Sequence, residues 1–512
     1  MRALEERKLT ICYTSDLHGH FYPTTYADRS EQPLGLFRLA PHFHKDGDTL
    51  VIDGGDILQG SPFAAYCKAA LSSPAAIADI MNRCGYDAIT LGNHDFNYGT
   101  EYLYAYLRAL RADCLCQNLC DENGEALFPY VVKTMANGLR VGIAGVVTDF
   151  VNIWEKPEKL SGIRIGPPFE AAKKALESMA DQVDITICVY HGGFERDLGT
   201  GRLLSQNGEN IAYRLCEELG YDILLTGHQH LSFSGRQIHG TFALQPTGNG
   251  REFHKIEVTY RGGAKVINSM RVLADAPADQ ALCEAFAGVE HGVQDWLDEE
   301  VGALPKALLP APRLEMARYG NGIAALFLAV QLHFSGAQIT AASLANEVAG
   351  FRERVTRRDI LASYPYSNTM VVLEVTGEKL KAAIERSASY FTLDADERIA
   401  ISEAFLMPKV EHYNYDYYAG VRYRIDVSRP LGQRVVSLCV RGNDVRPGDV
   451  FSICVSNYRA SGSGGYEVYA GCRVLREIQR ELSDLIIEYF ENGLHHALNE
   501  RALCDYQVVG GR

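Results

Sequence analysis

The sequence predicts an α/β domain in the first half of the chain and an α+β domain in the second. Short apolar runs alternate with longer amphipathic segments over residues 9–226, a pattern typical of helices that cover a sheet. A Pro-rich break, Leu308-Leu309-Pro310-Ala311-Pro312, follows later and is expected at a domain boundary. The length of 512 residues also exceeds the usual size of one hydrophobic core.

The first domain is expected over residues 1–275. Its expected strands are short and apolar: Leu9–Thr14, Thr49–Ile52, Ala88–Thr90, Arg140–Val147, Ile185–Tyr190 and Ile223–Thr226. Its expected helices include Ala75–Cys84, Thr100–Leu110, Pro168–Gln182 and Asn207–Leu219. A β-rich run over Phe242–Val272 is expected to complete this domain.

Residues 276–309 are expected to form a linker helix, over Asp279–Glu300, and the boundary itself. The second domain is then expected over residues 310–512. Its expected helices are Ile323–Phe334 and Gly377–Ser389. Its expected strands are Thr369–Val375, Gly420–Asp426, Val435–Val440 and Phe451–Val455.

The composition is that of an ordinary globular protein, with 47% hydrophobic and 22% charged residues. A formal net charge of −14 argues against a nucleic-acid duplex or an anionic membrane as the main partner. No stretch approaches the roughly 20 apolar residues that span a bilayer, and no signal peptide is visible. The 13 cysteines are scattered, as expected for reduced thiols in a cytoplasmic protein. The oligomeric state is left open.

Five short polar segments follow the expected strands. They are Thr14-Ser15-Asp16-Leu17-His18-Gly19, Asp53-Gly54-Gly55-Asp56, Gly92-Asn93-His94-Asp95, His191-Gly192-Gly193 and Gly227-His228-Gln229-His230. The carboxyl ends of strands are where α/β sheets bind ligands. Carboxylate, amide and imidazole groups together suit Mn, Zn or Fe ions. Two such ions can bind the attacking and the leaving oxygen of a phosphoester displacement.

Each segment alone has a structural explanation, because Asp-x-His is commonly a helix cap and Gly-Asn-His-Asp is commonly a turn. Five of them in this order, each after an apolar strand, are hard to obtain from turn chemistry. The series therefore predicts a two-metal phosphoesterase.

The series resembles the signature of calcineurin-like metallophosphoesterases. The second half, through Tyr364-Pro365-Tyr366-Ser367-Asn368-Thr369 and Ser456-Asn457-Tyr458-Arg459-Ala460-Ser461-Gly462, resembles the C-terminal domain of the 5′-nucleotidase family. The resemblance implies an N-terminal four-layer α/β/β/α domain, a linker helix and a C-terminal α+β domain of the 5′-nucleotidase type. Members of this family are often exported, so a removed leader stays open beside the cytoplasmic expectation.

The resemblance also implies the roles of individual residues. Asp16, His18 and His230 would hold one divalent ion. Asn93, His191 and His228 would hold the other, and Asp56 would bridge the two. The ions would be Mn, Zn, Fe or Co. His94 would face the phosphate of a nucleotide substrate and assist its leaving oxygen.

Asn97 departs from the pattern of the family, whose nucleotidases place Asp three residues after the catalytic histidine. An amide holds one imidazole tautomer but does not stabilise the imidazolium as a carboxylate does. Asp95 is an alternative partner, although an adjacent side chain is poorly placed. The run His94-Asp95-Phe96-Asn97-Tyr98-Gly99 resembles the branch of 2′,3′-cyclic-nucleotide 2′-phosphodiesterase/3′-nucleotidases. His94 and Asn97 are the expected catalytic residues.

Two tyrosines are expected to bind the substrate. Tyr413 and Tyr458 lie in segments that resemble the base-stacking segments of that branch, and aromatic faces accept any base. Most of the 28 tyrosines have structural roles instead. The ribose-binding Asp of 5′-nucleotidases is absent from the run Ser461-Gly462-Ser463-Gly464-Gly465-Tyr466.

These departures favour hydrolysis of 2′,3′-cyclic and 3′-nucleotides. Two alternatives stay open: a 5′-nucleotidase or UDP-sugar hydrolase, and a non-catalytic nucleotide or metal sensor. Comparing turnover of 5′-AMP with that of 3′-AMP separates the favoured function from that of a 5′-nucleotidase or UDP-sugar hydrolase. A lost metal ligand would identify the sensor, and the seven expected positions contain no such loss.

Overall fold

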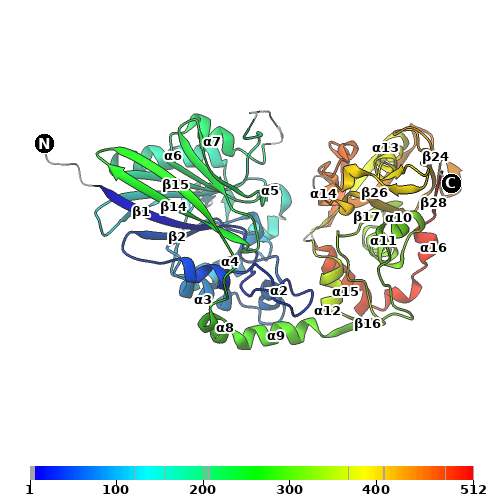
Figure 1. Cartoon of the computed structure of the whole chain (residues 1–512), viewed down its shortest axis with the longest axis horizontal. Helices are drawn as coiled ribbons and strands as arrows, with labels where there is room; N and C mark the ends of the chain where they lie inside the picture. Colours follow the sequence, from blue (N-terminus) through cyan, green and yellow to red (C-terminus); the bar gives the residue numbers. More distant parts are fainter. Residues whose placement is uncertain are drawn as a thin grey trace. The chain divides into compact units, whose positions relative to one another are not determined.

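The protein folds into two compact units. The computed structural model describes residues 6–121, 123–155, 157–199, 201, 203, 208–366, 368–406, 410–478 and 480–510. Unit 1 comprises Met1–Thr25 and Arg29–Asp295, and unit 2 comprises Tyr26–Asp28 and Trp296–Arg512. The border after Asp295 falls inside the segment expected as a linker (Figure 1). Each unit has its own apolar core.

Unit 1 contains two six-stranded sheets. The first has the order β15 (Ala264–Leu273), β14 (Glu252–Arg261), β1 (Arg7–Thr14), β2 (Thr49–Asp53), β3 (Ala88–Ile89), β4 (Asp113–Cys114). The second has the order β12 (Phe233–Ile238), β13 (Thr241–Gln245), β11 (Ile223–Thr226), β10 (Ile185–His191), β8 (Arg140–Val147), β7 (Val131–Thr134). Strands β1 to β4 run parallel, as do β8, β10, β11 and β13. The carboxyl ends of several strands are therefore gathered at one edge of each sheet.

One apolar core joins the two sheets. Ile11 and Ile52 of the first sheet belong to the same buried cluster as Ile143 and Ile187 of the second. On the outer face of the second sheet lie α6 (Pro168–Met179) and α7 (Ala212–Glu218), whose apolar sides pack on β8, β10 and β11. Figure 1 shows α2 (Pro62–Ala69), α3 (Ala75–Cys84) and α4 (Thr100–Ala109) on the other side of the unit. The expected four-layer α/β/β/α arrangement is confirmed.

The predicted elements agree with the structure where their apolar pattern is strong: β8, β11 and α3 have the predicted bounds. The predicted helix Asp279–Glu300 is wrong as one element. It divides at Phe286 into α8 (Gln280–Ala285) and α9 (Ala287–Leu297). Phe286 lies at the turn between these two helices, and its buried ring packs on Phe37 at 6.2 Å between ring centroids. Helix α7 begins at Ala212, and the predicted start at Asn207 lies outside the described residues.

Unit 2 is built around a five-stranded sheet of order β22 (Asp416–Ala419), β17 (Ile339–Ser343), β26 (Val450–Ser456), β19 (Met370–Thr376), β27 (Arg473–Ile478). A second, four-stranded sheet has the order β25 (Asn443–Asp444), β24 (Val435–Val440), β23 (Arg422–Asp426), β28 (Tyr506–Val509). Helix α11 (Gly322–Ser335) is apolar on most sides because it is buried within this unit. Helix α13 (Gly377–Ala388) contributes to the same core.

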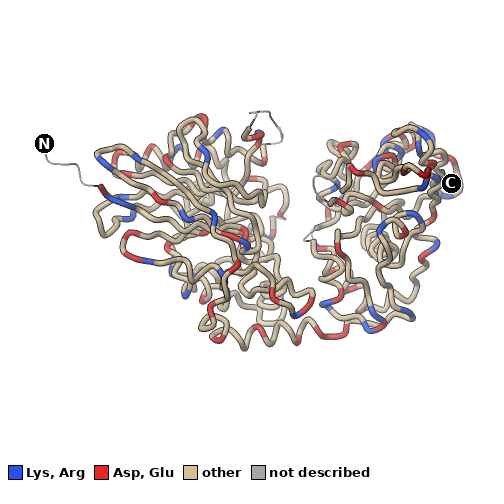
Figure 2. Tube along the Cα trace, viewed as in Figure 1, with Lys and Arg blue, Asp and Glu red and all other residues tan. Residues whose placement is uncertain are grey.

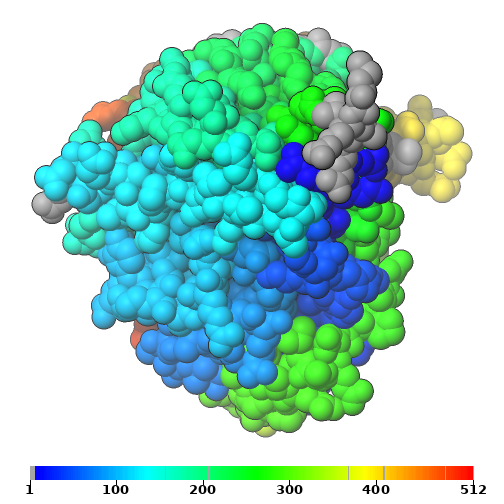
Figure 3. Space-filling view, turned by 90° about the vertical axis from the view of Figure 1, so that its left-hand side faces the viewer, coloured from blue at the N-terminus to red at the C-terminus, as the bar shows by residue number. Residues whose placement is uncertain are grey.

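Residues of both charges are spread along the chain. Lysine and arginine are interspersed with aspartate and glutamate along the trace of each unit (Figure 2). Figure 3 shows that segments far apart in the sequence lie next to one another on one face of unit 1. Among the described residues, no helix is both long and apolar enough to span a bilayer.

Candidate metal centre

The five polar segments of unit 1 meet at the carboxyl ends of strands from both sheets. Asp16 and Asp56 follow β1 and β2 of the first sheet, and His228 follows β11 of the second. The backbone N–H of Asp16 donates to Gly55 O at 2.9 Å, and that of His228 donates to Asp16 Oδ1 at 3.0 Å. The strand ends of the two sheets are thus bonded to one another. The sequence pattern located these segments but did not assign each of them to one of the two sheets.

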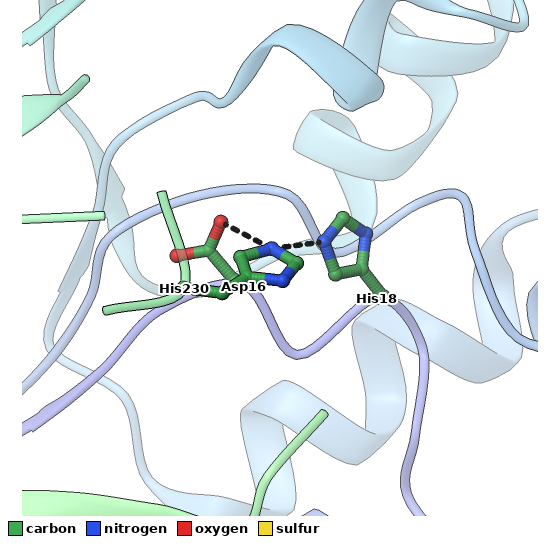
Figure 4. A group of neighbouring side chains, drawn as sticks. All are labelled: Asp16, His18 and His230. Carbon is green, nitrogen blue, oxygen red and sulfur yellow. Dashed lines mark hydrogen bonds and ion pairs between the residues drawn. The ribbon is translucent and has the colours of Figure 1, made fainter. Parts of the chain in front are cut away.

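One group of metal-binding atoms comes from Asp16, His18 and His230, whose ligand atoms lie within 4.8 Å of one another (Figure 4). His230 Nε2 is 3.2 Å from Asp16 Oδ1 and 3.1 Å from His18 Nε2. His18 Nδ1 faces the carbonyl oxygen of Gln59 at 2.9 Å, so this nitrogen is the donor. The Nε2 lone pair of His18 then points at His230. Such converging lone pairs fit a bound cation.

A second group comes from Asp56, His191 and His228. His191 Nδ1 donates to Gly54 O at 2.7 Å. Its Nε2 is buried, lies 3.2 Å from Asp56 Oδ2 and has no hydrogen-bond partner among the described residues. A buried ring nitrogen that has no hydrogen-bond partner and lies beside a carboxylate is suited to bind a metal ion. His228 Nδ1 faces Asn93 Oδ1 at 2.8 Å, which brings Asn93 to this group.

Asp56 lies between the two groups. Its Oδ2 is 3.2 Å from His191 Nε2 and 3.9 Å from His18 Nε2. Burial favours the neutral carboxyl, yet the charges of His191, His94 and His18 hold the pKa of Asp56 well below its ordinary value. Burial also disfavours the charged imidazole of His191, but without a bound ion Asp56 raises its pKa to about 10, so an ion that binds Nε2 would displace a proton from it. The field of this site thus keeps Asp56 ionised.

The backbone is strained at these side chains. Five residues have positive φ: Asp16 at 56°, His18 at 49°, Asp56 at 60°, His228 at 71° and His230 at 54°. Left-handed backbone costs a residue with a Cβ about 1–3 kcal/mol. This conformation persists only where the surroundings hold it in place, and it turns the side chains toward a common point. Such strain is typical of a functional site.

Asp95 holds one of these strained turns. Its carboxylate accepts hydrogen bonds from the backbone N–H groups of Gly92, Asp56, Ile57 and Leu58, at 2.8–3.0 Å. The carboxylate oxygens are therefore engaged with the loop that carries Asp56. The alternative prediction that Asp95 is the partner of His94 is therefore wrong.

His94 and Asn97 lie together. Asn93 and His94 belong to a short 3₁₀ helix, η2 (Asn93–Phe96), and Asn97 follows at its end. Residues three apart eclipse one another in such a turn, so Asn97 Oδ1 reaches His94 Nδ1 at 2.7 Å. The backbone N–H of His94 donates to Asp56 Oδ1 at 2.7 Å. The half-buried ring of His94 lies 5.3 Å from that of His18, centroid to centroid.

Two residues that no motif marked contact His228. Glu209 Oε1 is 2.9 Å from His228 Nε2. Trp154 stacks on the His228 ring at 5.6 Å, with 24° between the planes. Neither residue lies near the polar segments in sequence, so spacing could not have found them.

In unit 2, Arg459 joins the two segments expected to bind the substrate. Its buried guanidinium pairs with Asp416, Nη2 to Oδ1, at 2.9 Å. It also donates to Tyr413 O at 2.6 Å and lies 5.3 Å from the ring centre of Tyr458. The Tyr458 side chain is exposed and that of Tyr413 is half-buried. Ser367 belongs to the segment Tyr364–Thr369, which resembles the 5′-nucleotidase family, and lies outside the described residues.

Comparisons with known proteins agree with this arrangement. Residues 9–232 match the calcineurin-like phosphoesterase family, and residues 311–471 match the 5′-nucleotidase C-terminal domain. The 2′,3′-cyclic-nucleotide 2′-phosphodiesterase/3′-nucleotidase of Haemophilus influenzae is 24% identical over 89% of this chain and 80% of its own length. A trifunctional nucleotide phosphoesterase of Bacillus subtilis is 25% identical over 94% of this chain, which spans only 38% of that protein.

Two solved structures are similar over nearly the whole chain. A Staphylococcus aureus protein assigned as a 5′-nucleotidase, in complex with alpha-ketoglutarate, is 33% identical, with a TM-score of 0.81. The match covers 98% of this chain and 100% of that one. A 5′-nucleotidase precursor of Thermus thermophilus is 22% identical, with a TM-score of 0.61 over 98% and 99% of the chains, and shares the fold.

Gly92→Ala is expected to weaken metal binding. The φ of Gly92, −102°, tolerates a side chain, but a Cβ there would lie 2.1 Å from Asp56 Oδ1 and displace it. Displacing one ligand should lower divalent-metal affinity by at least about tenfold, measured by equilibrium dialysis. In the control Gly166→Ala, the Cβ would meet its nearest atom, Asn118 O, at 3.8 Å. Equal metal affinity in Gly92→Ala and wild type would contradict this site geometry.

Proposed function

The chain belongs to the family of calcineurin-like phosphoesterases with a 5′-nucleotidase C-terminal domain, and from this premise we propose that it hydrolyses 2′,3′-cyclic nucleotides and 3′-nucleotides. The family consists of phosphoester hydrolases, and this chain is one of them. The observation that carries the proposal is the pair of ligand groups that share Asp56. The choice of ester depends on the residues around His94 and in unit 2.

In this proposal, Asp16, His18 and His230 would hold one divalent ion. Asn93, His191 and His228 would hold the second, and Asp56 would contribute to both sites. The donors are carboxylate, amide and imidazole without thiolate, which suits Mn, Zn, Fe or Co ions. Bound ions supply Lewis acidity and positive charge to the phosphate oxygens.

His94 acts on the phosphate and on the leaving oxygen. Its Nδ1 is engaged by Asn97, so its Nε2 is the nitrogen left for the substrate. In the charged form, Nε2–H would stabilise the negative charge of the transition state and transfer its proton to the departing nucleoside oxygen. Its backbone bond to Asp56 keeps this ring beside the ligand groups.

Asn97 supports the choice of 2′,3′-cyclic and 3′-nucleotides. It stands where 5′-nucleotidases have Asp, and three cyclic-nucleotide phosphodiesterases/3′-nucleotidases are 24–25% identical to this chain over 88–89% of its length. Tyr413 and Tyr458 would stack on the base, and Arg459 holds both of their segments. The ribose-binding Asp of 5′-nucleotidases is absent from Ser461–Tyr466.

A second candidate function is that of a 5′-nucleotidase or UDP-sugar hydrolase. The observation in its favour is the 33% identity to the Staphylococcus aureus protein assigned as a 5′-nucleotidase. A non-catalytic sensor is disfavoured, because each of the seven expected ligand positions keeps a metal-binding side chain.

A substrate panel tests the proposed function. With Mn²⁺, Zn²⁺ or Co²⁺ supplied in turn, the protein should open 2′,3′-cyclic AMP and dephosphorylate 3′-AMP. Their kcat/KM should exceed that of 5′-AMP and UDP-glucose by about tenfold or more. Faster turnover of 5′-AMP would establish the second candidate instead. Metal binding without phosphate release from any of these substrates would establish the sensor.

Tyr458→Ala is expected to weaken nucleotide binding selectively. Loss of one stacking face, about 1–3 kcal/mol, should raise the KM for 3′-AMP about tenfold or more. Hydrolysis of bis-nitrophenyl phosphate, which carries no base, should remain near the wild-type rate. The matched control is Tyr319→Ala in the same unit, which removes a tyrosine that is 70% exposed and lies outside these segments. Equal losses on both substrates would show that Tyr458 is a structural residue.

A further inference from the structure

His94 stands at the end of a chain of four side chains. Asn97 Oδ1 is 2.7 Å from His94 Nδ1, and Asn97 Nδ2 donates to Glu155 Oε1 at 2.5 Å. Glu155 Oε2 in turn lies 3.0 Å from Lys159 Nζ. Asn97 and Glu155 are 58 residues apart in sequence, so no motif connects them. A carboxylate therefore stands behind the amide that replaces the usual Asp.

The chemistry of the chain fixes its direction. An ionised carboxylate only accepts hydrogen bonds, so Asn97 must turn its NH₂ group toward Glu155. The amide oxygen then faces His94, which must donate from Nδ1. Reversing the amide would set its oxygen against the carboxylate oxygen of Glu155. The carboxylate thus selects the tautomer of an imidazole that it does not touch.

Glu155 is held where it can perform this role. Its side chain is only 5% exposed, and burying a carboxylate is unfavourable unless partners compensate for it. Lys159, four residues later in the sequence, supplies the opposite charge, and Asn97 supplies the hydrogen bond. Glu155 also directly follows α5 (Val151–Trp154), whose Trp154 stacks on His228. The segment 151–155 thus reaches both His228 and the His94–Asn97 pair.

We propose that Glu155 is a positioning residue that holds His94 in its Nδ1-protonated form through Asn97. Through the amide of Asn97, Glu155 also provides the His94 imidazolium with a nearby negative charge, as a directly bonded Asp would. Hydrogen bonds in series polarise one another, so the amide transmits part of this charge. This inference rests on the proposed role of His94 at the leaving oxygen.

Exchanging the amide and the carboxylate tests the proposal. Glu155→Gln removes the charge and lets Asn97 reverse, and should lower kcat about 10–100-fold. Asn97→Asp alone sets two carboxylates against each other and should also lower kcat. In Asn97→Asp/Glu155→Gln the direction and the charge both return, so kcat should recover to within about tenfold of wild type. The control Glu158→Gln makes the same charge change at an exposed neighbour and should leave kcat unchanged.

Leaving-group dependence separates positioning from a structural role. Glu155→Gln should lower kcat more for unsubstituted phenyl phosphodiesters than for nitrophenyl phosphodiesters. The more basic phenyl oxygen depends more strongly on receiving a proton as it leaves. Long-range proton–nitrogen NMR of histidine-labelled protein should show Nδ1-protonated His94 in wild type and in the double variant, and a mixture of tautomers in Glu155→Gln. Thermal unfolding checks that each variant is folded.

Three results would overturn the proposal: equal losses across the aryl series, a double variant no better than the poorer single one, or an unchanged His94 tautomer in Glu155→Gln. If wild type hydrolyses the aryl esters but no nucleotide, the proposed substrate class fails. The aryl comparison and the NMR measurement still decide the role of Glu155 in that case.

Discussion

The buried carboxylate of Asp56 is the interaction on which the candidate centre depends. It is 1% exposed, and an isolated ionised carboxylate at such a position is unfavourable by several kcal/mol. His18 and His191 come to it from different sheets, and the backbone N–H of His94 donates to it. Both sheets must therefore end their parallel strands at this carboxylate.

Several local features follow from that requirement. The turns after β1, β2 and β11 adopt left-handed backbone at residues with side chains, and these residues are five of the seven expected metal ligands. Gly92 has no side chain because the Asp56 carboxylate occupies the space of a Cβ. Asp95 offsets part of the strain by binding four backbone N–H groups. The run from Gly92 to Asp95 thus leaves room for the Asp56 carboxylate and also holds the loop that carries it.

Sequence reasoning located the polar segments because each ligand directly follows a strand with a strong apolar pattern. It could not locate contacts between segments far apart in sequence. Strand patterns do not encode which strands pair, so they did not assign each ligand to one of the two sheets. Glu155 lies 58 residues from Asn97, and Arg459 organises Tyr413 from 46 residues away. The division of the helix at Phe286 was also missed, because the spacing of apolar residues within this segment does not show the contact of Phe286 with the distant Phe37.

The central claim is that Asp56 joins two metal sites, and the number of bound ions tests it most directly. Wild type and Asp56→Asn would be equilibrated with Mn²⁺ or Zn²⁺, desalted and measured by elemental analysis and native mass spectrometry. Two bridged sites predict two ions per wild-type chain and fewer in Asp56→Asn, with loss of phosphoester hydrolysis. One ion in wild type, or two ions and full turnover in the variant, would contradict the claim.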